Sequence, residues 1–133
     1  MKIMSYSYDD PGYLTLMSYQ SWRVAFLNYI DELKPENIPY FEAHHKTDEV
    51  FVLLEGDAIL YYLEDGKVMH VKMVKNKVYN VKKDVYHTHA LSPDCKLLII
   101  EEENTSDDNS SRIYVDDEMR KALVKIWRGE VEV

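Results

Sequence analysis

The chain has 133 residues, of which 46% are hydrophobic, and a formal net charge of −8 at neutral pH. This length is typical of one domain with one core, and the acidic balance argues against nucleic acid as a partner, because phosphate backbones require clustered Lys and Arg. Cys95 is the single cysteine, so no internal disulfide can form, and neither a signal-peptide run nor a stretch of roughly 20 apolar residues is found. We therefore expect a single cytoplasmic domain over residues 1–133 that does not bind a membrane.

Short runs of strand-forming residues recur along most of the chain, at spacings of about ten residues. The pair Asp65-Gly66 lies between two of these runs and is the strongest hairpin signal, because both positions tolerate the positive φ angles of a type I′ turn. This rhythm predicts an antiparallel barrel or sandwich. The expected strands are 13–19, 22–29, 49–54, 58–63, 68–74, 78–81, 85–91 and 96–102, with 40–44 as an extended arm after a proline-containing connection.

The C-terminal part is predicted to be a polar loop over 103–111 followed by the one helix of the chain, at about 116–128. Asp116 or Asp117 can cap the helix, and Gly129 can end it. Met119, Leu123, Ile126 and Trp127 share one face, so we expect the helix to pack on the outside of the barrel or on a second subunit. The core barrel is expected to cover residues 13–103.

Two pairs of polar residues have the spacing that places both members on one side of a strand. Glu42 and His44 lie two positions apart on the extended arm, and His87 and His89 have the same spacing farther along the chain. Glu49 opens an inward-facing series that continues with Phe51 and Leu53, and a buried carboxylate of this kind usually pairs with a cation. Two carboxylates and up to two imidazoles inside a small barrel suit zinc or a first-row transition metal.

These residues also resemble the motifs of the cupin superfamily. The run His44 to Gly56 reads His-x4-Glu-x6-Gly, which is similar to the second half of the first cupin motif, and the second motif maps onto Asn76 through Leu91 with His87 as its histidine. The resemblance implies an all-β fold, an antiparallel cupin β-barrel (double-stranded β-helix or jelly roll) with one C-terminal α-helix. It also implies a divalent metal held by Glu42, His44, Glu49 and His87.

Some residues differ from the family pattern, and the differences have physical consequences. Glu42 stands in place of the first histidine, which favours harder ions such as Mn²⁺ or Fe²⁺. Asn76 and Asp84 replace two glycines but tolerate left-handed backbone geometry. Lys82 and Leu91 replace a proline and an asparagine.

The remaining expectations concern the surroundings of the metal and the function. An alternative register would use His45 as the ligand, but we prefer His44 because it leaves Glu42 a role; His45 and His70 are expected to face solvent. The ion is expected to be Mn, Fe, Ni or Zn, with His89, Phe51 and Tyr61 as further pocket residues. The protein would then act on or bind a small polar metabolite, as a metal-dependent isomerase or oxygenase. The alternative is a ligand-binding or structural dimer without metal, and a homodimer is expected in either case because of the apolar N-terminal strands and helix face.

Overall fold

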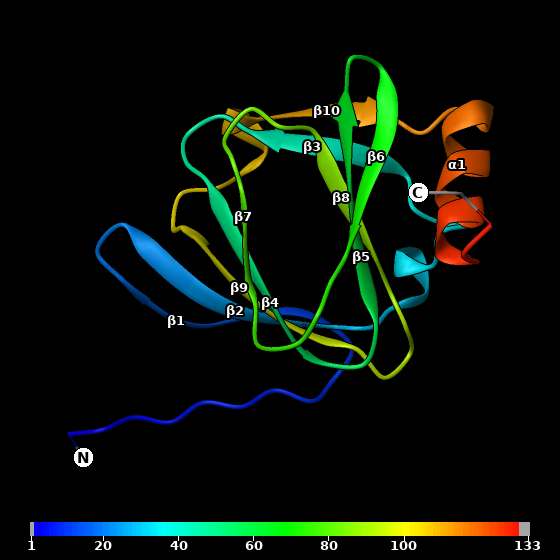
Figure 1. The fold of residues 1–133 in the computed structure, drawn as a ribbon. Helices are drawn as coiled ribbons and strands as arrows, with labels where there is room; N and C mark the ends of the chain where they lie inside the picture. The colour runs from blue at the N-terminus through cyan, green and yellow to red at the C-terminus, as the bar shows by residue number, and fades with distance from the viewer. Residues whose placement is uncertain (1, 131–133) are drawn as a thin grey trace.

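The computed structural model describes residues 2–130 as two antiparallel sheets of five strands each that curve around a common interior (Figure 1). The first sheet has the strand order β1-β2-β9-β4-β7, and the second has the order β10-β3-β8-β5-β6. The strands are β1 (Gly12–Tyr19), β2 (Trp22–Asn28), β3 (Tyr40–His44), β4 (Glu49–Glu55), β5 (Ala58–Glu64), β6 (Lys67–Lys72), β7 (Val78–Val81), β8 (His87–Leu91), β9 (Lys96–Glu102) and β10 (Ser110–Tyr114). This arrangement confirms the predicted all-β barrel.

Buried apolar side chains form two layers. One layer fills the space between the sheets and includes Phe51 and Leu97, and the other lies between the second sheet and helix α1 (Asp117–Trp127) and includes Phe41 and Leu123. The middle strands of the second sheet, β3, β8 and β5, therefore carry most of its buried side chains. Side-chain alternation decides what each face carries: along β3, Phe41 faces the helix layer and its neighbours in sequence face the interior.

The helix lies against the outside of the second sheet, as Figure 1 shows in orange and red. The carboxylate of Asp116 accepts a hydrogen bond from the backbone N–H of Met119 and caps the first turn, and Gly129, at φ +72°, follows the last turn. Met119 and Trp127 pack on the buried cluster of Leu123 and Ile126. The predicted helix and its apolar face are thus confirmed, and the barrel covers that face.

The turns form where the sequence predicts them. Asp65 and Gly66 have φ angles of 52° and 76° and join β5 to β6. Asn76 and Asp84, which occupy glycine positions of the cupin motif, also adopt positive φ angles of 66° and 71°. Short polar side chains therefore adopt at these two turns the positive φ that glycine tolerates.

The segment before the helix differs from the predicted loop. The predicted loop 103–111 ends at Asn109 in a 3-10 turn (Asp107–Asn109), and β10 follows and pairs with β3. The barrel thus extends beyond residue 103. The strand begins with two serines that follow a polar stretch, so its start has no local strand signal, and pairing with β3 carries the strand back over these residues. A second 3-10 turn, Asp31–Leu33, precedes β3, and no helix of the described part of the chain is long and apolar enough to cross a membrane.

Candidate metal centre

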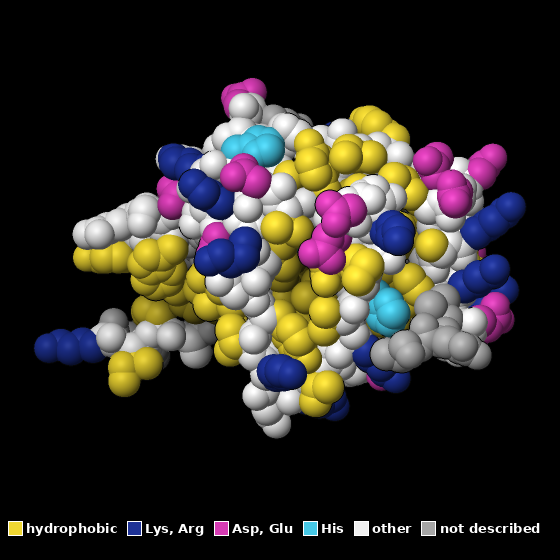
Figure 2. Space-filling model, turned by 45° about the horizontal axis from the view of Figure 1, so that its top comes forward, with side chains coloured by type: hydrophobic (Ala, Val, Ile, Leu, Met, Phe, Trp, Pro, Cys, Tyr) yellow, Lys and Arg dark blue, Asp and Glu magenta, His cyan; other side chains and the backbone are white. Residues whose placement is uncertain are grey.

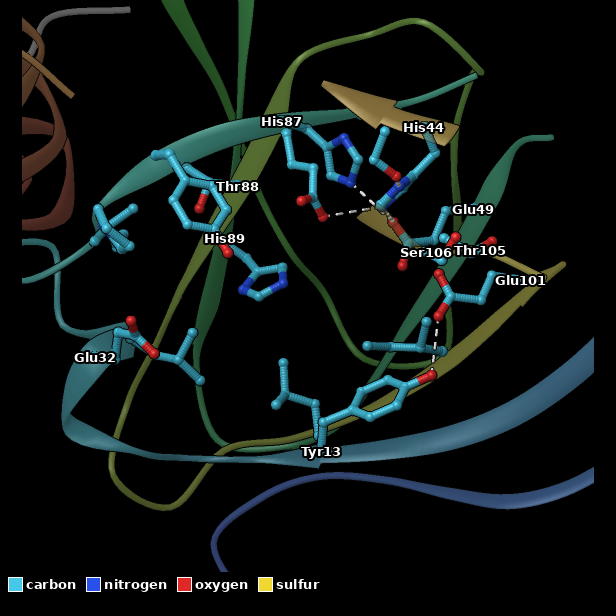
Figure 3. Close-up of a pocket in the computed structure, with 18 of the residues that line it drawn as sticks. Tyr13, Glu32, His44, Glu49, His87, Thr88, His89, Glu101, Thr105 and Ser106 are labelled. Atoms are coloured by element: carbon cyan, nitrogen blue, oxygen red, sulfur yellow. Dashed lines mark hydrogen bonds and ion pairs between the residues drawn. The ribbon is translucent and has the colours of Figure 1, made fainter. Parts of the chain in front are cut away.

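Three side chains from both sheets bring one ligand atom each to a common point inside the barrel. His44 ends β3, Glu49 begins β4 and His87 begins β8, and one ligand atom from each lies within 4.8 Å of the others. Oε1 of Glu49 is 2.8 Å from Nε2 of His87 and 3.3 Å from Nε2 of His44. Figure 3 shows the two imidazoles and the carboxylate converging. We call these three residues the central cluster.

Contacts to Nδ1 hold both imidazoles in place, on the side of each ring away from the centre. Nδ1 of His87 lies 3.0 Å from the carbonyl oxygen of Val85, which can only accept, so this nitrogen carries a proton and donates. Nδ1 of His44 lies 2.8 Å from Oγ of Ser110 on β10. Both rings therefore present Nε2 to the centre, as metal-binding histidines do when their other nitrogen is held by an outer partner.

The central cluster is electrostatically coupled. Burial alone would raise the pKa of Glu49, but hydrogen bonds from His44 and His87 hold it well below its ordinary value. Burial alone would lower the pKa of His44, whereas the hydrogen bond and charge of Glu49, followed by the charge of Glu42, raise it. The two Nε2 atoms and the Glu49 oxygen that share hydrogen bonds in this cluster are also the atoms that would bind a cation. Binding of a cation would therefore release the protons of these hydrogen bonds.

Glu42, the fourth predicted ligand, lies at the edge of the central cluster. It pairs directly opposite His87 in the β3–β8 register. Its Oε2 accepts a hydrogen bond of 2.9 Å from Nε of Arg112, and its Oε1 is 3.7 Å from Nε2 of His44. The structure therefore places three of the four predicted ligands in one group and the fourth beside it.

Glu101 is a site residue that the sequence analysis missed. Its carboxyl is buried, and burial followed by the hydrogen bond and charge of Glu49 raises its pKa to about 7. The guanidinium of Arg23 and the hydroxyl of Tyr13 both donate to its Oε1, at 2.5 Å and 2.9 Å. The signal was present: Leu97 and Ile99 point inward, so Glu101 continues the same face of β9.

A cavity of about 430 Å³ opens beside the central cluster, a size suited to a small molecule. His89 lines it, and burial lowers the pKa of its imidazole to about 4, so the ring is neutral near pH 7. Phe51 is fully buried behind the histidines, with its ring centroid 5.9 Å from that of His87 and 5.7 Å from that of His89. Phe51 thus supports the two rings from the core.

Tyr61 occupies a different place from the predicted one. It pairs opposite Thr88 and therefore lies on the other face of the sheet from His87 and His89. Its hydroxyl donates to the carbonyl of Leu123 in the helix layer. Tyr61 does not line the 430 Å³ cavity; it borders a smaller cavity of about 230 Å³ on the other side of His87.

His45 lies outside the central cluster. Its Nδ1 is 2.8 Å from Oδ1 of Asp84 and its Nε2 is 2.6 Å from Oγ of Ser111, at the protein surface. It is thus partly exposed, as expected, but has an acidic neighbour that its sequence surroundings do not reveal. The register with His44 as ligand is the one that the geometry favours.

No family model and no curated protein matches the chain, but solved structures do. A cupin-2 domain protein from Shewanella frigidimarina NCIMB 400 aligns at 18% identity and a TM-score of 0.50, covering 72% of this chain and 85% of that chain. HppE with Fe(II) and substrate aligns at 18% identity and a TM-score of 0.54, covering 67% of this chain and 52% of that one. Fe(II) HppE gives 13% identity and a TM-score of 0.53, covering 67% and 49%.

The chain therefore has the fold of the cupin superfamily, as its motifs predict. The His44-Glu49-His87 group makes it compatible with a small metal-binding cupin. The chain spans about half the length of HppE, and identities this low establish the fold alone.

Proposed function

We propose that the protein is a metal-dependent cupin that binds one divalent ion through Nε2 of His44, Oε1 of Glu49 and Nε2 of His87. The observation that carries this proposal is the convergence of these three atoms within 4.8 Å. Two imidazoles and one carboxylate with open coordination positions are typical of non-haem Fe(II) sites. Fe²⁺ is therefore the first candidate, with Mn²⁺, Ni²⁺ and Zn²⁺ as alternatives.

Glu42 is proposed as the fourth ligand. Its Oε1 lies 3.7 Å from Nε2 of His44, and its Oε2 can stay on Arg112 while Oε1 turns to the ion. Two carboxylates and two neutral imidazoles would balance the +2 charge. Because Arg112 also neutralises Glu42, this ligand would bind more weakly than Glu49.

The proposed activity is the conversion of a small polar metabolite in the 430 Å³ cavity, as an isomerase or an oxygenase. A bound ion would supply Lewis-acid chemistry to a ligand oxygen. The chain itself orients the ligating rings through Ser110 and the Val85 carbonyl, and the fold excludes bulk water from Glu49. HppE, which shares the fold, holds Fe(II) and a substrate in its own structures.

A metal-free binding module is the second candidate. Three carboxylates at the central cluster already have partners: Glu42 has Arg112, Glu49 has the two histidines and Glu101 has Arg23. Such a network can balance its charges without an ion. Saturable binding of a metabolite that survives metal removal and gives no product would support this candidate.

Elemental analysis of natively purified protein tests the proposal. We expect close to one transition-metal ion per chain, or loading to that level with Fe²⁺, Mn²⁺, Ni²⁺ or Zn²⁺. Because the pKa of His44 is raised, protons compete with the ion at and above the usual imidazole range, and occupancy should fall as pH decreases through it. Protein that stays metal-free under all four ions would contradict the proposal.

A homodimer and a cytoplasmic location complete the proposal. Figure 2 shows hydrophobic side chains gathered on the part that projects at the left, where the β1–β2 hairpin and the N-terminal arm lie in Figure 1. Exposed apolar residues there include Leu14, Tyr19 and Trp22, and β1 is a sheet edge that a second copy could cover. Sedimentation as a monomer at micromolar concentration would contradict the dimer. The buried free thiol of Cys95 suits a reducing cytoplasm.

A further inference from the structure

His89 lines the cavity with an imidazole whose Nδ1 has no hydrogen-bond partner in the described part of the chain. Its side chain lies between the central cluster and Glu32 in Figure 3. Nδ1 is buried and makes no hydrogen bond with any residue that the structure describes. Leaving such an atom unpaired is unfavourable. A neutral imidazole has one donor and one acceptor nitrogen, so His89 can both give and receive a hydrogen bond.

The cations near the cavity are already engaged by the protein. Arg23 is the only Lys or Arg among the residues that line it within the described ranges. Its guanidinium donates to the carboxylate of Glu101 and to the carbonyl oxygen of Glu103. Arg112, just outside, donates to Glu42.

The lining is otherwise acidic. Four glutamates contribute to it, and two of them are ion-paired with the arginines; the four are Glu32, Glu42, Glu49 and Glu101. A phosphate, or a carboxylate that does not bind the ion, would therefore have to compete with Glu42 or Glu101 for a guanidinium. A molecule with uncharged hydroxyl or carbonyl oxygens needs no such counter-charge.

We propose that His89 is a ligand-binding residue that hydrogen-bonds an oxygen of a small, neutral hydroxycarbonyl or vicinal dihydroxy compound, the substrate class of this site. The proposal rests on the metal-dependent function above, which provides the chelating end for adjacent oxygens. His89 would then form a hydrogen bond with an oxygen of the ligand from the cavity wall. It lies two positions after His87 on β8, with the same inward direction, so both ends of the ligand can be held at once.

The test uses Co²⁺-loaded protein and two matched probe pairs. The first pair is dihydroxyacetone and dihydroxyacetone phosphate, and the second is catechol and 3,4-dihydroxybenzoate. Calorimetry and the Co²⁺ absorption spectrum report binding. In each pair that binds, we expect the neutral member to bind about tenfold tighter or more than its anionic counterpart, which corresponds to about 1.4 kcal/mol.

Variants assign the effect to His89. His89→Phe should weaken binding of the neutral probe about tenfold, the loss expected for one hydrogen bond, and should leave the Co²⁺ stoichiometry unchanged. His89→Asn retains a donor and an acceptor and should restore most of the affinity. The matched control is His70→Phe, the same exchange on β6 outside the cavity lining.

The outcomes separate this inference from the metal proposal. The Co²⁺ stoichiometry is measured first, and if no metal binds, the same calorimetric comparison on metal-free protein still decides the role of His89. Tighter binding of the anionic probes, equal binding by wild type and His89→Phe, or no binding of either neutral probe would each overturn the inference. Tighter binding of the neutral probe that is lost in His89→Phe supports the inference, whether or not the ion is bound.

Discussion

Nε2 of His87 lies 2.8 Å from Oε1 of Glu49, although 38 positions separate the two residues. They meet because β8 and β4 belong to different sheets and both present the first residue of the strand to the barrel interior. The carboxylate of Glu49 is the shared point, since Nε2 of His44 also approaches the same oxygen.

His87→Ala should remove most metal binding, whereas His45→Ala should leave it unchanged. His87 supplies an atom of the central cluster, and His45 is held at the surface by Asp84 and Ser111. Metal content per chain, measured after identical loading and dialysis, checks this. A reversed order of the two variants, or an empty site in His45→Ala with an intact one in His44→Ala, would show that the other register is correct.

Glu49→Gln should cost more metal affinity than Glu42→Gln. Glu49 is shared by both histidines and its side chain is 9% exposed, whereas Glu42 is 24% exposed and bound to Arg112. We expect the loss to be about tenfold for Glu42→Gln, comparable to the loss of an outer partner, and well beyond that for Glu49→Gln. Competition with a chelator of known affinity measures both. Equal losses of metal affinity would mean that Glu42 contributes as much to metal binding as Glu49.

Ser110→Ala should weaken metal binding by about tenfold without unfolding the protein. The hydroxyl of Ser110 holds Nδ1 of His44, and its removal frees the ring to rotate away from the centre. Ser111→Ala is the matched control, because that hydroxyl contacts His45 instead. Unchanged affinity in Ser110→Ala would mean that β3 packing alone orients His44.

Stability of the metal-free protein should fall as pH rises from about 4.5 to about 7, in part because of Glu101. Its pKa is raised from 4.5 to about 7, so in this window the folded protein holds a proton that the unfolded chain has lost. The raised pKa of His44 adds a loss in the same direction as pH rises above its ordinary value of 6.5. Glu101→Gln should flatten the profile by roughly 3 kcal/mol, since a difference of one pKa unit corresponds to about 1.4 kcal/mol.

Denaturant unfolding at several pH values, with chelator present, measures this difference. Wild type and Glu101→Gln should differ in slope between these limits and run parallel above them. The depressed pKa of Glu49 acts at lower pH, where its contribution is lost as pH falls through its folded pKa. Parallel profiles over the whole range would show that Glu101 does not hold its proton.

Tyr61→Phe should reduce the free energy of unfolding by about 1 kcal/mol and leave metal binding intact. The hydroxyl is buried and donates to the carbonyl of Leu123, so its loss removes one buried hydrogen bond between β5 and helix α1. Thermal unfolding and metal content, measured on the same samples, separate the two effects. A variant that loses metal but unfolds at the normal temperature would instead indicate that Tyr61 contributes to the metal pocket.

Local patterns in the sequence determined the strands, the turns and the direction of several site residues. Alternation alone places Glu42 and His44 on one side of β3, and Asp65-Gly66, Asn76 and Asp84 mark turns because few other residues tolerate positive φ. These are properties of neighbouring residues. They do not depend on which strands pair.

Only the tertiary structure decided which elements meet. Ser110 and Glu101 reach the site because β10 pairs with β3 and because β9 lies beside β4, and no local pattern encodes those neighbours. Tyr61 shows the limit of alternation: four consecutive residues of β5, from Ala58, are buried, since the barrel core covers one face and the helix layer the other. A strand that is apolar on both faces carries no signal of which face is the inside, so packing alone assigns it.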